Sequence, residues 1–410
     1  MAKSEIIAGV DIGSSQIVCV IARRNTLNHN AIEVLGSGRK FCRGLKGGVV
    51  ININETAQSI TQAVEEAEDA AKESVNEIYL AIRGNHIQSF NHHGAINIAR
   101  TDKEIMSEDV TMVIDAAKAV PISQDREIIH IIPQDFSLDR QRGVPNPIGM
   151  EGTLLEVDVH MVTASGTHLN NIWKSVNRAG FTVVEPIDGL LAVGEIVVSE
   201  EEKELGSLLI DFGGQTIGIG VYSDGSIHFS KEIPIGSDFI SKDISYGLRT
   251  SMATAQTIKE RYGAAMLSLI NDDEEIEFTS VDGKTTHHVQ RQTVVEIIQP
   301  RIEEIFSLIS EEVQNSGFAD IVIPGGVILT GGGSLLPGMT NAAEQIIGMP
   351  TRLGRPQNIT SPEDIASNPI YATAIGTLMF PWVSEWKKSM NKVSKGGMVK
   401  KVKGWFEGIF

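Results

Sequence analysis

The chain has 410 residues, of which 41% are hydrophobic, so it can bury a large core and divide into two or more domains. Its formal net charge of −17 argues against a general nucleic-acid-binding protein, because phosphate contacts require clustered lysines and arginines. Two cysteines without metal-ligand spacing, a start without a secretory signal, and no run near the roughly 18 apolar residues of a membrane span favour a cytoplasmic protein that does not cross a membrane.

The first element that the sequence predicts is a tight hairpin. The stretch EIIAGVDIGSSQIVCVIARR, residues 5–24, is apolar on both sides of a short turn at 11–15. The pattern returns half a chain later as GSLLIDFGGQTIGIGVYSDGSI, in which Asp211 stands where Asp11 stood. Two copies of a strand, an Asp-x-Gly turn and a second strand indicate a duplicated domain.

Helices and strands alternate between and after the two hairpins. Apolar positions at helical spacing, among them Ile60, Val64 and Ala67, predict an amphipathic helix over 54–71. Residues 84–162 change character and are interpreted as an inserted module. The other expected elements are strands at 77–84 and 157–165, helices at 167–179 and 255–263, a helix opened by Ser107, a surface loop at 140–152, an acidic loop at 271–277, a long helix at 293–313 interrupted by Pro300, and a strand, glycine-rich turn and helix within 325–339.

Three glycine-rich turns follow apolar strands, at 11–15, 211–216 and 331–334. Turns of Gly, Ser and Thr leave backbone N–H groups free to point at an anion, and glycine lets the backbone approach it closely. An Asp at a strand end is suited to holding Mg²⁺ through water beside a phosphate, so Asp11 and Asp211 are the candidate metal residues. The turns supply these candidate nucleotide-binding residues: Asp11, Gly13, Ser14, Ser15, Asp211, Gly213, Gly214, Gln215, Thr216, Gly331, Gly332, Gly333 and Ser334.

Competing nucleotide signatures are absent from the sequence. No G-x-x-x-x-G-K-[ST] occurs, and GSGRKF and GIGVYS both lack the last glycine of the dinucleotide pattern. The alternative is that each turn merely connects two strands. Three such turns in this order, two of them with an aspartate, favour a polyphosphate site.

The order of the three turns is similar to that in the superfamily of actin, Hsp70 and the sugar kinases. DIGSS resembles its first phosphate loop, DFGGQT its second and LTGGGSLLPGM its adenosine turn, while NPIYATAIGTL resembles its interdomain helix, whose small residues let two helices pack closely. Within this superfamily, FCRGLKGGVVININETAQSITQAVEEAE, HIIPQDFSLD, NPIGMEG and QRQTVVEIIQPR resemble FtsA, the family of bacterial actin-like cell-division proteins.

The resemblance covers essentially the whole chain and implies an α/β fold. This is a duplicated actin-like (ribonuclease H-like) two-lobed ATPase fold with an inserted FtsA-type subdomain in the first lobe and a C-terminal amphipathic helix. The implied domains are a first actin-like domain at 1–83, 163–196 and 361–384, the inserted subdomain at 84–162, a second actin-like domain at 197–235 and 301–360, a small subdomain at 236–300, a flexible linker at 385–397 and a membrane-targeting helix at 398–410.

The resemblance also implies a cell-division function and no metabolic reaction. The family binds ATP with Mg²⁺ between its lobes, polymerises, binds the C-terminal peptide of the tubulin-like FtsZ and tethers the Z ring to the inner face of the cytoplasmic membrane, where later division proteins are recruited through the inserted subdomain. Gly236 and Lys259 match nucleotide positions. Arg291 and Arg301 match positions near the FtsZ-peptide site, although each alone could be an ordinary surface arginine.

The sequence departs from the family at the expected nucleotide. The second loop usually has a third glycine and a further Asp, where this chain has Gln215 and Gly218, and Gln256 stands where the adenosine helix usually has Glu. We therefore expect ATP to bind and to be hydrolysed slowly at most. Glu185, followed by Pro186, resembles a carboxylate near the attacking water in relatives and is the candidate catalytic residue; the alternative is a glutamate that merely starts a helix.

The last residues differ in charge and pattern from the rest. Residues 385–410 hold seven lysines and two glutamates, a net charge of +5, which leaves −22 on the first 384 residues. On a helix, Val402, Trp405, Phe406, Ile409 and Phe410 share one face and Lys400, Lys401 and Lys403 flank it, which is typical of a helix lying in a membrane surface. The alternative is a helix that docks on the protein's own core.

Two other functions share the expected fold. A sugar or acid kinase would need a carboxylate base for a substrate hydroxyl, and no second motif supplies one. An actin-like pilus-assembly ATPase should lack the amphipathic tail.

Overall fold

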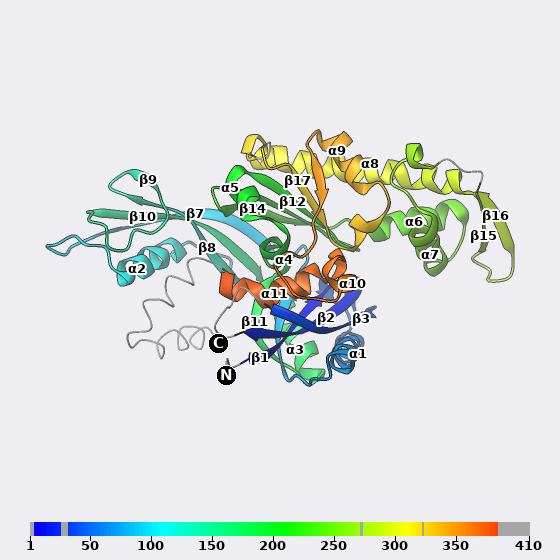
Figure 1. Ribbon diagram of the computed structural model, residues 1–410, viewed down its shortest axis with the longest axis horizontal. Helices are drawn as coiled ribbons and strands as arrows, with labels where there is room; N and C mark the ends of the chain where they lie inside the picture. Colours follow the sequence, from blue (N-terminus) through cyan, green and yellow to red (C-terminus); the bar gives the residue numbers. More distant parts are fainter. Residues whose placement is uncertain (1–3, 26–31, 271–273, 322–323, 384–410) are drawn as a thin grey trace.

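The computed structural model describes residues 4–25, 32–270, 274–321 and 324–383, and two five-stranded sheets form its centre (Figure 1). In the first sheet the neighbours are, in order, β11 (Thr182–Asp188), β6 (Glu77–Ile82), β1 (Ser4–Ile12), β2 (Gln16–Asn25) and β3 (Ile32–Phe41). In the second sheet they are β14 (Ser226–Ile233), β13 (Ile217–Ser223), β12 (Ser207–Phe212), β17 (Val327–Thr330) and β18 (Thr351–Leu353).

The two sheets share one topology. In each, three consecutive strands form an antiparallel meander, and two later strands continue the sheet in parallel on the other side of the first strand. The predicted hairpins are β1–β2 and β12–β13. The repeated strand order confirms the predicted duplication, and we call the two halves the first and second lobes.

Helices cover the first sheet closely. The helix α1 (Ile53–Ala71) starts at Asn52, whose Oδ1 accepts hydrogen bonds from the backbone N–H groups of Asn54 and Glu55 at 3.0 and 3.2 Å. It crosses β3 where a Cβ on Gly38 would lie 2.1 Å from the Ala63 carbonyl oxygen, so only glycine fits there. The other elements of this lobe are β4 (Leu45–Lys46), β5 (Val49–Val50), α3 (Gly166–Arg178), α4 (Gly189–Val197), α10 (Glu363–Ala366), η4 (Pro369–Tyr371) and α11 (Ala372–Val383).

The second lobe carries one long helix, α8 (Arg291–Ser316), which continues into a small subdomain (Figure 1). The predicted interruption at Pro300 is wrong, because the helix runs through it. Proline removes one backbone hydrogen bond, but the fully buried side chains of Ile298, Ile302 and Ile305 hold both halves on the core. The remaining elements are α5 (Glu200–Leu205), η2 (Ala319–Ile321), η3 (Gly332–Leu335) and α9 (Met339–Ile347) in the lobe, and α6 (Ser237–Leu248), α7 (Met252–Tyr262), η1 (Leu267–Leu269), β15 (Glu275–Thr279) and β16 (Thr286–Gln290) in the small subdomain.

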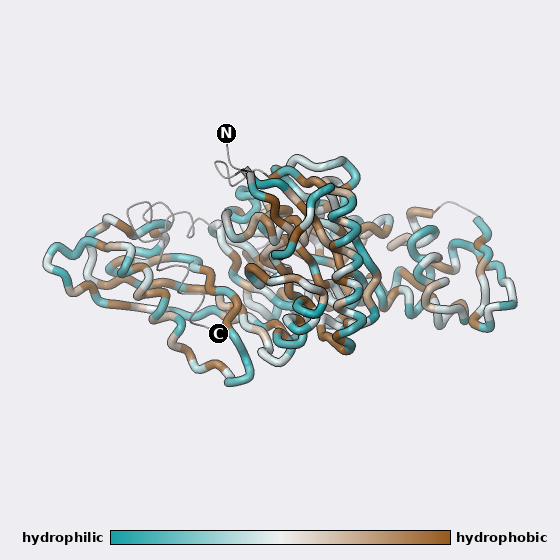
Figure 2. Tube along the Cα trace, turned by 90° about the horizontal axis from the view of Figure 1, so that it is seen from below, coloured by the Kyte–Doolittle hydropathy of each residue, from teal (hydrophilic) through white to brown (hydrophobic). Residues whose placement is uncertain are grey.

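The inserted module is a separate four-stranded sheet with one helix, and it projects from the body opposite the small subdomain (Figure 1). Its sheet order is β7 (Gln88–Asn97), β10 (Leu154–Ser165), β8 (Arg126–Leu138) and β9 (Gln141–Val144), with α2 (Ser107–Lys118) packed on it. Residues 140–152 were expected to be loop throughout, and β9 corrects this: Val144 is buried and adds an edge strand, while the rest is mainly exposed. Hydrophobic segments gather in the body and along the strands of the module (Figure 2).

The module lies against β14, the outer strand of the second lobe. The side chains of Ser89, Asn91 and Gln134 donate hydrogen bonds to β14 carbonyl oxygens at 2.6, 2.9 and 2.7 Å. Between them His160 is buried and contacts Ser230 Oγ at 2.8 Å. Burial lowers the pKa of His160 to about 3, so the imidazole is neutral at this junction.

The helices α4 and α11 cross between the lobes with their backbones in direct contact. A Cβ on Gly376 would lie 2.0 Å from the carbonyl oxygen of Ala192. This contact agrees with the resemblance of 368–378 to a helix whose small residues allow close packing. The predicted linker at 385–397 and amphipathic helix at 398–410 lie outside the described residues. Among the described residues, no helix is long and apolar enough to cross a membrane.

Candidate nucleotide-binding site

The first two glycine-rich turns have the same local geometry. Asp11 lies at the end of β1 in register with Ala81, and Asp211 lies at the end of β12 in register with Thr330. In each turn the glycine two residues after the aspartate lies close to the carbonyl oxygen three residues further on. A Cβ on Gly13 would lie 2.7 Å from Gln16 O, and a Cβ on Gly213 would lie 2.6 Å from Thr216 O. The repeat of the sequence therefore places two aspartates at matching positions in two lobes.

The two turns lie against each other. A Cβ on Gly214 would lie 1.9 Å from Ser15 Oγ, and Ser15 Oγ donates a hydrogen bond to Asp238 at 3.0 Å. Gln215, where we expected glycine, joins the lobes: its Oε1 accepts from the Gly47 N–H at 2.9 Å and its Nε2 donates to Asp238 at 3.1 Å. Ser14 Oγ accepts from the Gly48 N–H at 2.7 Å.

The third turn adjoins the second. Gly331 has φ +82°, a left-handed conformation that favours glycine, and a Cβ there would lie 2.4 Å from Asp211 Oδ1. Ser334 Oγ closes the turn by donating to the Gly331 carbonyl at 2.6 Å. Gly333 packs against Phe212, and Gly332 lies between Gly331 and Gly333 in the chain. All three predicted turns thus meet at the edges of the two sheets.

The small subdomain contributes Lys259 and Gly236 to the same region. Gly236 precedes α6 and packs against the carbonyl oxygens of Gly213 and Gly214. Lys259 is buried and its Nζ donates to the Ser237 carbonyl at 3.0 Å. Burial lowers the pKa of Lys259 to about 8, against the opposing effect of Asp238 and Glu260.

A charged residue that the sequence reasoning missed stands at the centre of the site. Arg83 follows β6, and its Nε lies 3.2 Å from Asp11 Oδ1 while its Nη2 donates hydrogen bonds to Asp211 Oδ2 and Thr373 Oγ1. Burial alone would lower the pKa of Arg83, but Asp211 and Asp11 raise it above its usual value. The guanidinium therefore stays charged between the two aspartates.

Two further buried carboxyl groups face this guanidinium. Burial raises the pKa of Asp188 to about 6, partly offset by the Leu191 N–H and by Arg83. Burial raises the pKa of Glu232 to about 7, with Arg83 opposing the shift and Asp188 and Asp211 adding to it. Burial also raises the pKa of Asp11 against the effect of Arg83.

Glu232 occupies space that a missing side chain leaves open. It is the cross-strand neighbour of Gly218, and a Cβ on Gly218 would lie 3.0 Å from Glu232 Oε1. The sequence pattern led us to expect an aspartate at Gly218, and in the structure a carboxylate from β14 lies beside this position instead. A single sequence could reveal this only if the register of β13 and β14 were known.

Glu185, the candidate catalytic residue, lies earlier on its strand than the site. Glu185 is in register with Tyr79. Asp188 lies three residues further on, about 10 Å away along an extended strand. It is in register with Ile82, the residue before Arg83. Asp188 is thus the carboxylate of β11 that lies beside Arg83, and the role of Glu185 stays a prediction.

The two candidate peptide-binding arginines both lie on α8. Arg291 donates to the Tyr262 carbonyl at 2.9 Å and pairs with Glu274 at 3.2 Å. Arg301 pairs with Asp243 and Glu304. Ten residues of helix separate them by about 15 Å. The candidate membrane-binding residues lie outside the described residues.

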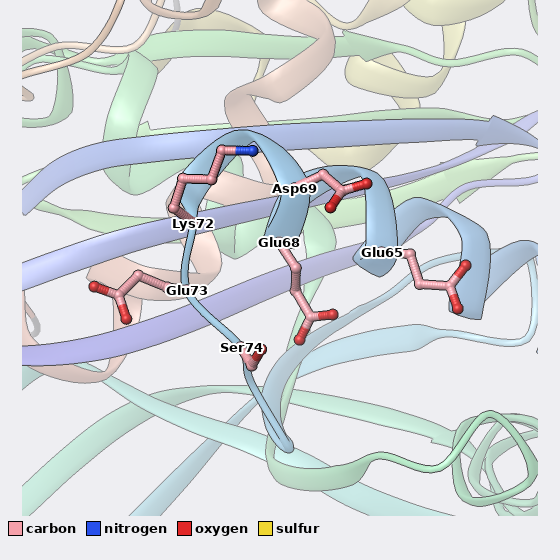
Figure 3. Close-up of a pocket in the computed structure, with 6 residues that line it drawn as sticks. All are labelled: Glu65, Glu68, Asp69, Lys72, Glu73 and Ser74. Carbon is pink, nitrogen blue, oxygen red and sulfur yellow. The ribbon is translucent and has the colours of Figure 1, made fainter.

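A surface hollow of about 470 Å³ at the C-terminal end of α1 is a separate feature (Figure 3). Four of its six lining residues are acidic, namely Glu65, Glu68, Asp69 and Glu73, beside Lys72 and Ser74. A hollow with this charge repels phosphate, so it is no alternative to the site between the turns.

Comparison with known proteins identifies the family. Residues 208–376 match the family described as cell division protein FtsA, and residues 84–163 match the SHS2 domain inserted in FtsA. The cell division protein FtsA of Pseudomonas aeruginosa is 38% identical over 100% of this chain and 99% of its own length. The chain belongs to the FtsA family. The FtsA proteins of Neisseria meningitidis and Escherichia coli K12 are 36% and 31% identical, over 100% and 99% of this chain and 99% and 98% of their own lengths.

Solved structures show the fold independently of the FtsA sequence match. A chain of the PilM-PilN type IV pilus biogenesis complex aligns with a TM-score of 0.67 at 14% identity, over 91% of this chain and 97% of its own. MreB5 of Spiroplasma citri bound to ADP aligns with a TM-score of 0.56 at 13% identity, over 96% and 99%. The actin-like fold is therefore confirmed, while the full-length identity to FtsA favours cell division over pilus assembly.

Proposed function

We propose that this chain is an ATP-binding actin homologue of the division machinery, which polymerises and tethers FtsZ to the inner face of the cytoplasmic membrane. The observation that carries the proposal is the relationship to FtsA proteins over the whole chain. The meeting of three glycine-rich turns from two lobes supports its nucleotide-binding part.

ATP is proposed to lie where the turns meet. Its phosphates would accept hydrogen bonds from backbone N–H groups of 11–15 and 211–216. Its nucleoside would lie toward 331–334 and Lys259. Asp11 and Asp211 would hold the accompanying Mg²⁺ through water, since two buried carboxylates face one positive group from opposite lobes. Magnesium would neutralise phosphate charge at this point. Asp211→Ala should weaken ATP binding about tenfold or more, because it removes one of the two carboxylates that hold the positive charge of the site in place beside the phosphates.

The FtsZ peptide is proposed to bind near α8 in the small subdomain. The guanidinium of Arg301 is about one quarter exposed and is shared between Asp243 and Glu304. Partly exposed ion pairs contribute little to stability, so an acidic peptide can replace one of these carboxylates. Other division proteins are proposed to bind the inserted module.

The tail from residue 398 is proposed to be the membrane anchor. One amphipathic helix binds a bilayer weakly, and a filament that presents many tails binds it far more tightly. Anionic lipids should strengthen the contact through Lys400, Lys401 and Lys403, at about 1 kcal/mol for each lysine.

The deciding experiment is recruitment of FtsZ to anionic liposomes by the purified full-length chain with ATP. FtsZ should sediment with the vesicles only when the chain is present, and an FtsZ that lacks its C-terminal peptide should stay in solution. Failure of the intact FtsZ to sediment, with the chain itself bound to the vesicles, would contradict the adaptor function.

A further inference from the structure

The Asp11–Asp211 pair already has a cation that belongs to the chain. The side chain of Arg83 is 7% exposed and reaches one aspartate of each lobe, as well as Thr373 at the start of α11. A buried charge is stable only if it is paired, and here one guanidinium is paired with two carboxylates. It therefore performs the electrostatic task that the proposed Mg²⁺ would perform.

The position of Arg83 is fixed by the surrounding backbone. A Cβ on Gly189 would lie 2.7 Å from Arg83 Cγ, and one on Gly48 would lie 2.3 Å from the Arg83 carbonyl oxygen. Glycine at these two positions leaves a slot that the arginine fills. The guanidinium is thus held in place before any ligand arrives.

Part of the hydrogen-bonding capacity of the site is unused. Arg83 Nε and Asp11 Oδ1 are ion-paired at 3.2 Å, yet neither atom has a hydrogen-bond partner among the described residues. Arginine has five donors in a planar fork that matches phosphate oxygens. The contacts with Asp11, Asp211 and Thr373 use Nε and Nη2, so Nη1 is the donor left for a phosphate that enters between the two Asp-x-Gly turns.

We propose that Arg83 is a resident cation of the nucleotide site, which binds the phosphates of ATP directly and makes Mg²⁺ dispensable for binding. The inference rests on the proposed nucleotide-binding function. The guanidinium is already paired with the two carboxylates proposed above for Mg²⁺, so a metal held there through water adds charge at a place that a cation occupies. Added Mg²⁺ therefore gives little further affinity for ATP.

The test compares ATP binding by the full-length chain in Mg²⁺ and in excess EDTA, measured by titration calorimetry. The wild type should bind ATP with dissociation constants within about threefold in the two conditions. In R83M the dissociation constant in EDTA should rise roughly 10- to 100-fold, because a charged hydrogen-bond donor is lost, and Mg²⁺ should restore most of it. The matched control is R39M, at an exposed arginine of β3, which should behave as the wild type does.

A second measurement needs no nucleotide. R83M leaves the two aspartates without their cation, so Mg²⁺ alone should raise the melting temperature of R83M and leave that of the wild type unchanged. If R83M does not fold, R83K provides the same comparison, because lysine keeps the charge but lacks the fork; its ATP binding in EDTA should be weaker than that of the wild type and recover in Mg²⁺.

The outcomes separate the two proposals. ATP binding by the wild type that is lost in EDTA, with the same Mg²⁺ dependence in R83M or R83K, would overturn the resident cation and leave nucleotide binding intact. No ATP binding in either condition would overturn the proposed nucleotide site, and the resident cation with it.

Discussion

Glu232→Gln should stabilise the protein, and the gain should depend on pH. Glu232 is 8% exposed, its carboxylate oxygens make no hydrogen bond of normal geometry among the described residues, and the nearby Thr216 hydroxyl and Arg83 only partly offset the effect of burial. Burial is the main reason that its pKa rises from 4.5 to about 7. A buried carboxylate whose charge is only partly compensated destabilises the folded state, and a neutral amide of the same shape does not carry that penalty.

The size and the sign of this pH dependence follow from the number of protons that the folded and unfolded chains bind. Between pH 4.5 and about 7 the folded chain keeps a proton on Glu232 that the unfolded chain has lost, so the free energy of unfolding falls as pH rises through this window. The difference between a pKa of 4.5 in the unfolded chain and about 7 in the folded chain corresponds to about 3 kcal/mol. This loss of unfolding free energy is fully present above pH 7. Asp188, whose pKa is raised to about 6, adds to the penalty in the same direction and remains in the variant.

The assay is urea unfolding of the wild type and E232Q at pH 4.5, 6 and 8 without nucleotide. We expect the two proteins to agree at pH 4.5 and to differ by about 3 kcal/mol in favour of E232Q at pH 8. The control is E277Q, at an exposed glutamate of β15. A difference between E232Q and the wild type that is the same at pH 4.5 and pH 8 would refute the assignment of Glu232 as a buried carboxyl group with a raised pKa.

Three further predictions concern the lobe junction, the peptide site and the tail. Gly376→Ala should lower the free energy of unfolding by about 1–3 kcal/mol, because the added Cβ would lie 2.0 Å from Ala192 O. This loss should outweigh the normal preference of a helix for alanine over glycine. Thermal unfolding measures the effect, and the control is Gly220→Ala, where the nearest atom would be 3.5 Å from the added Cβ. Arg301→Glu should weaken binding of an FtsZ C-terminal peptide in fluorescence anisotropy and leave ATP binding unchanged; equal peptide affinity would remove Arg301 from the site. Trp405→Glu should release the chain from anionic liposomes in a flotation assay, and continued flotation would place the anchor elsewhere.

Local sequence was sufficient for the features that depend on local geometry. The two hairpins were predictable because an Asp-x-Gly turn between apolar strands admits few other structures, and their similarity revealed the duplicated lobe. Pro300 was misjudged because a local rule was applied to a helix whose two halves are held by buried side chains on the same core.

The residues that were missed act through contacts between distant segments. Arg83 is one polar residue after an apolar strand and belongs to no motif, yet its partners Asp11 and Asp211 lie in different lobes. An arginine that ends a buried strand beside a glycine was the available signal. Glu232 becomes meaningful only once β14 is paired with β13 so that it stands opposite Gly218.

The contact between the inserted module and β14 also bears on how the chain is made. An uncovered outer strand offers free backbone groups to other chains and promotes aggregation during folding. Residues 88–165 precede β14 in the chain, so a ribosome completes the module before it completes the strand that the module will cover. The inserted module is therefore already synthesised when β14 leaves the ribosome. This order along the chain lowers the risk that β14 pairs with another chain while the second lobe is folding.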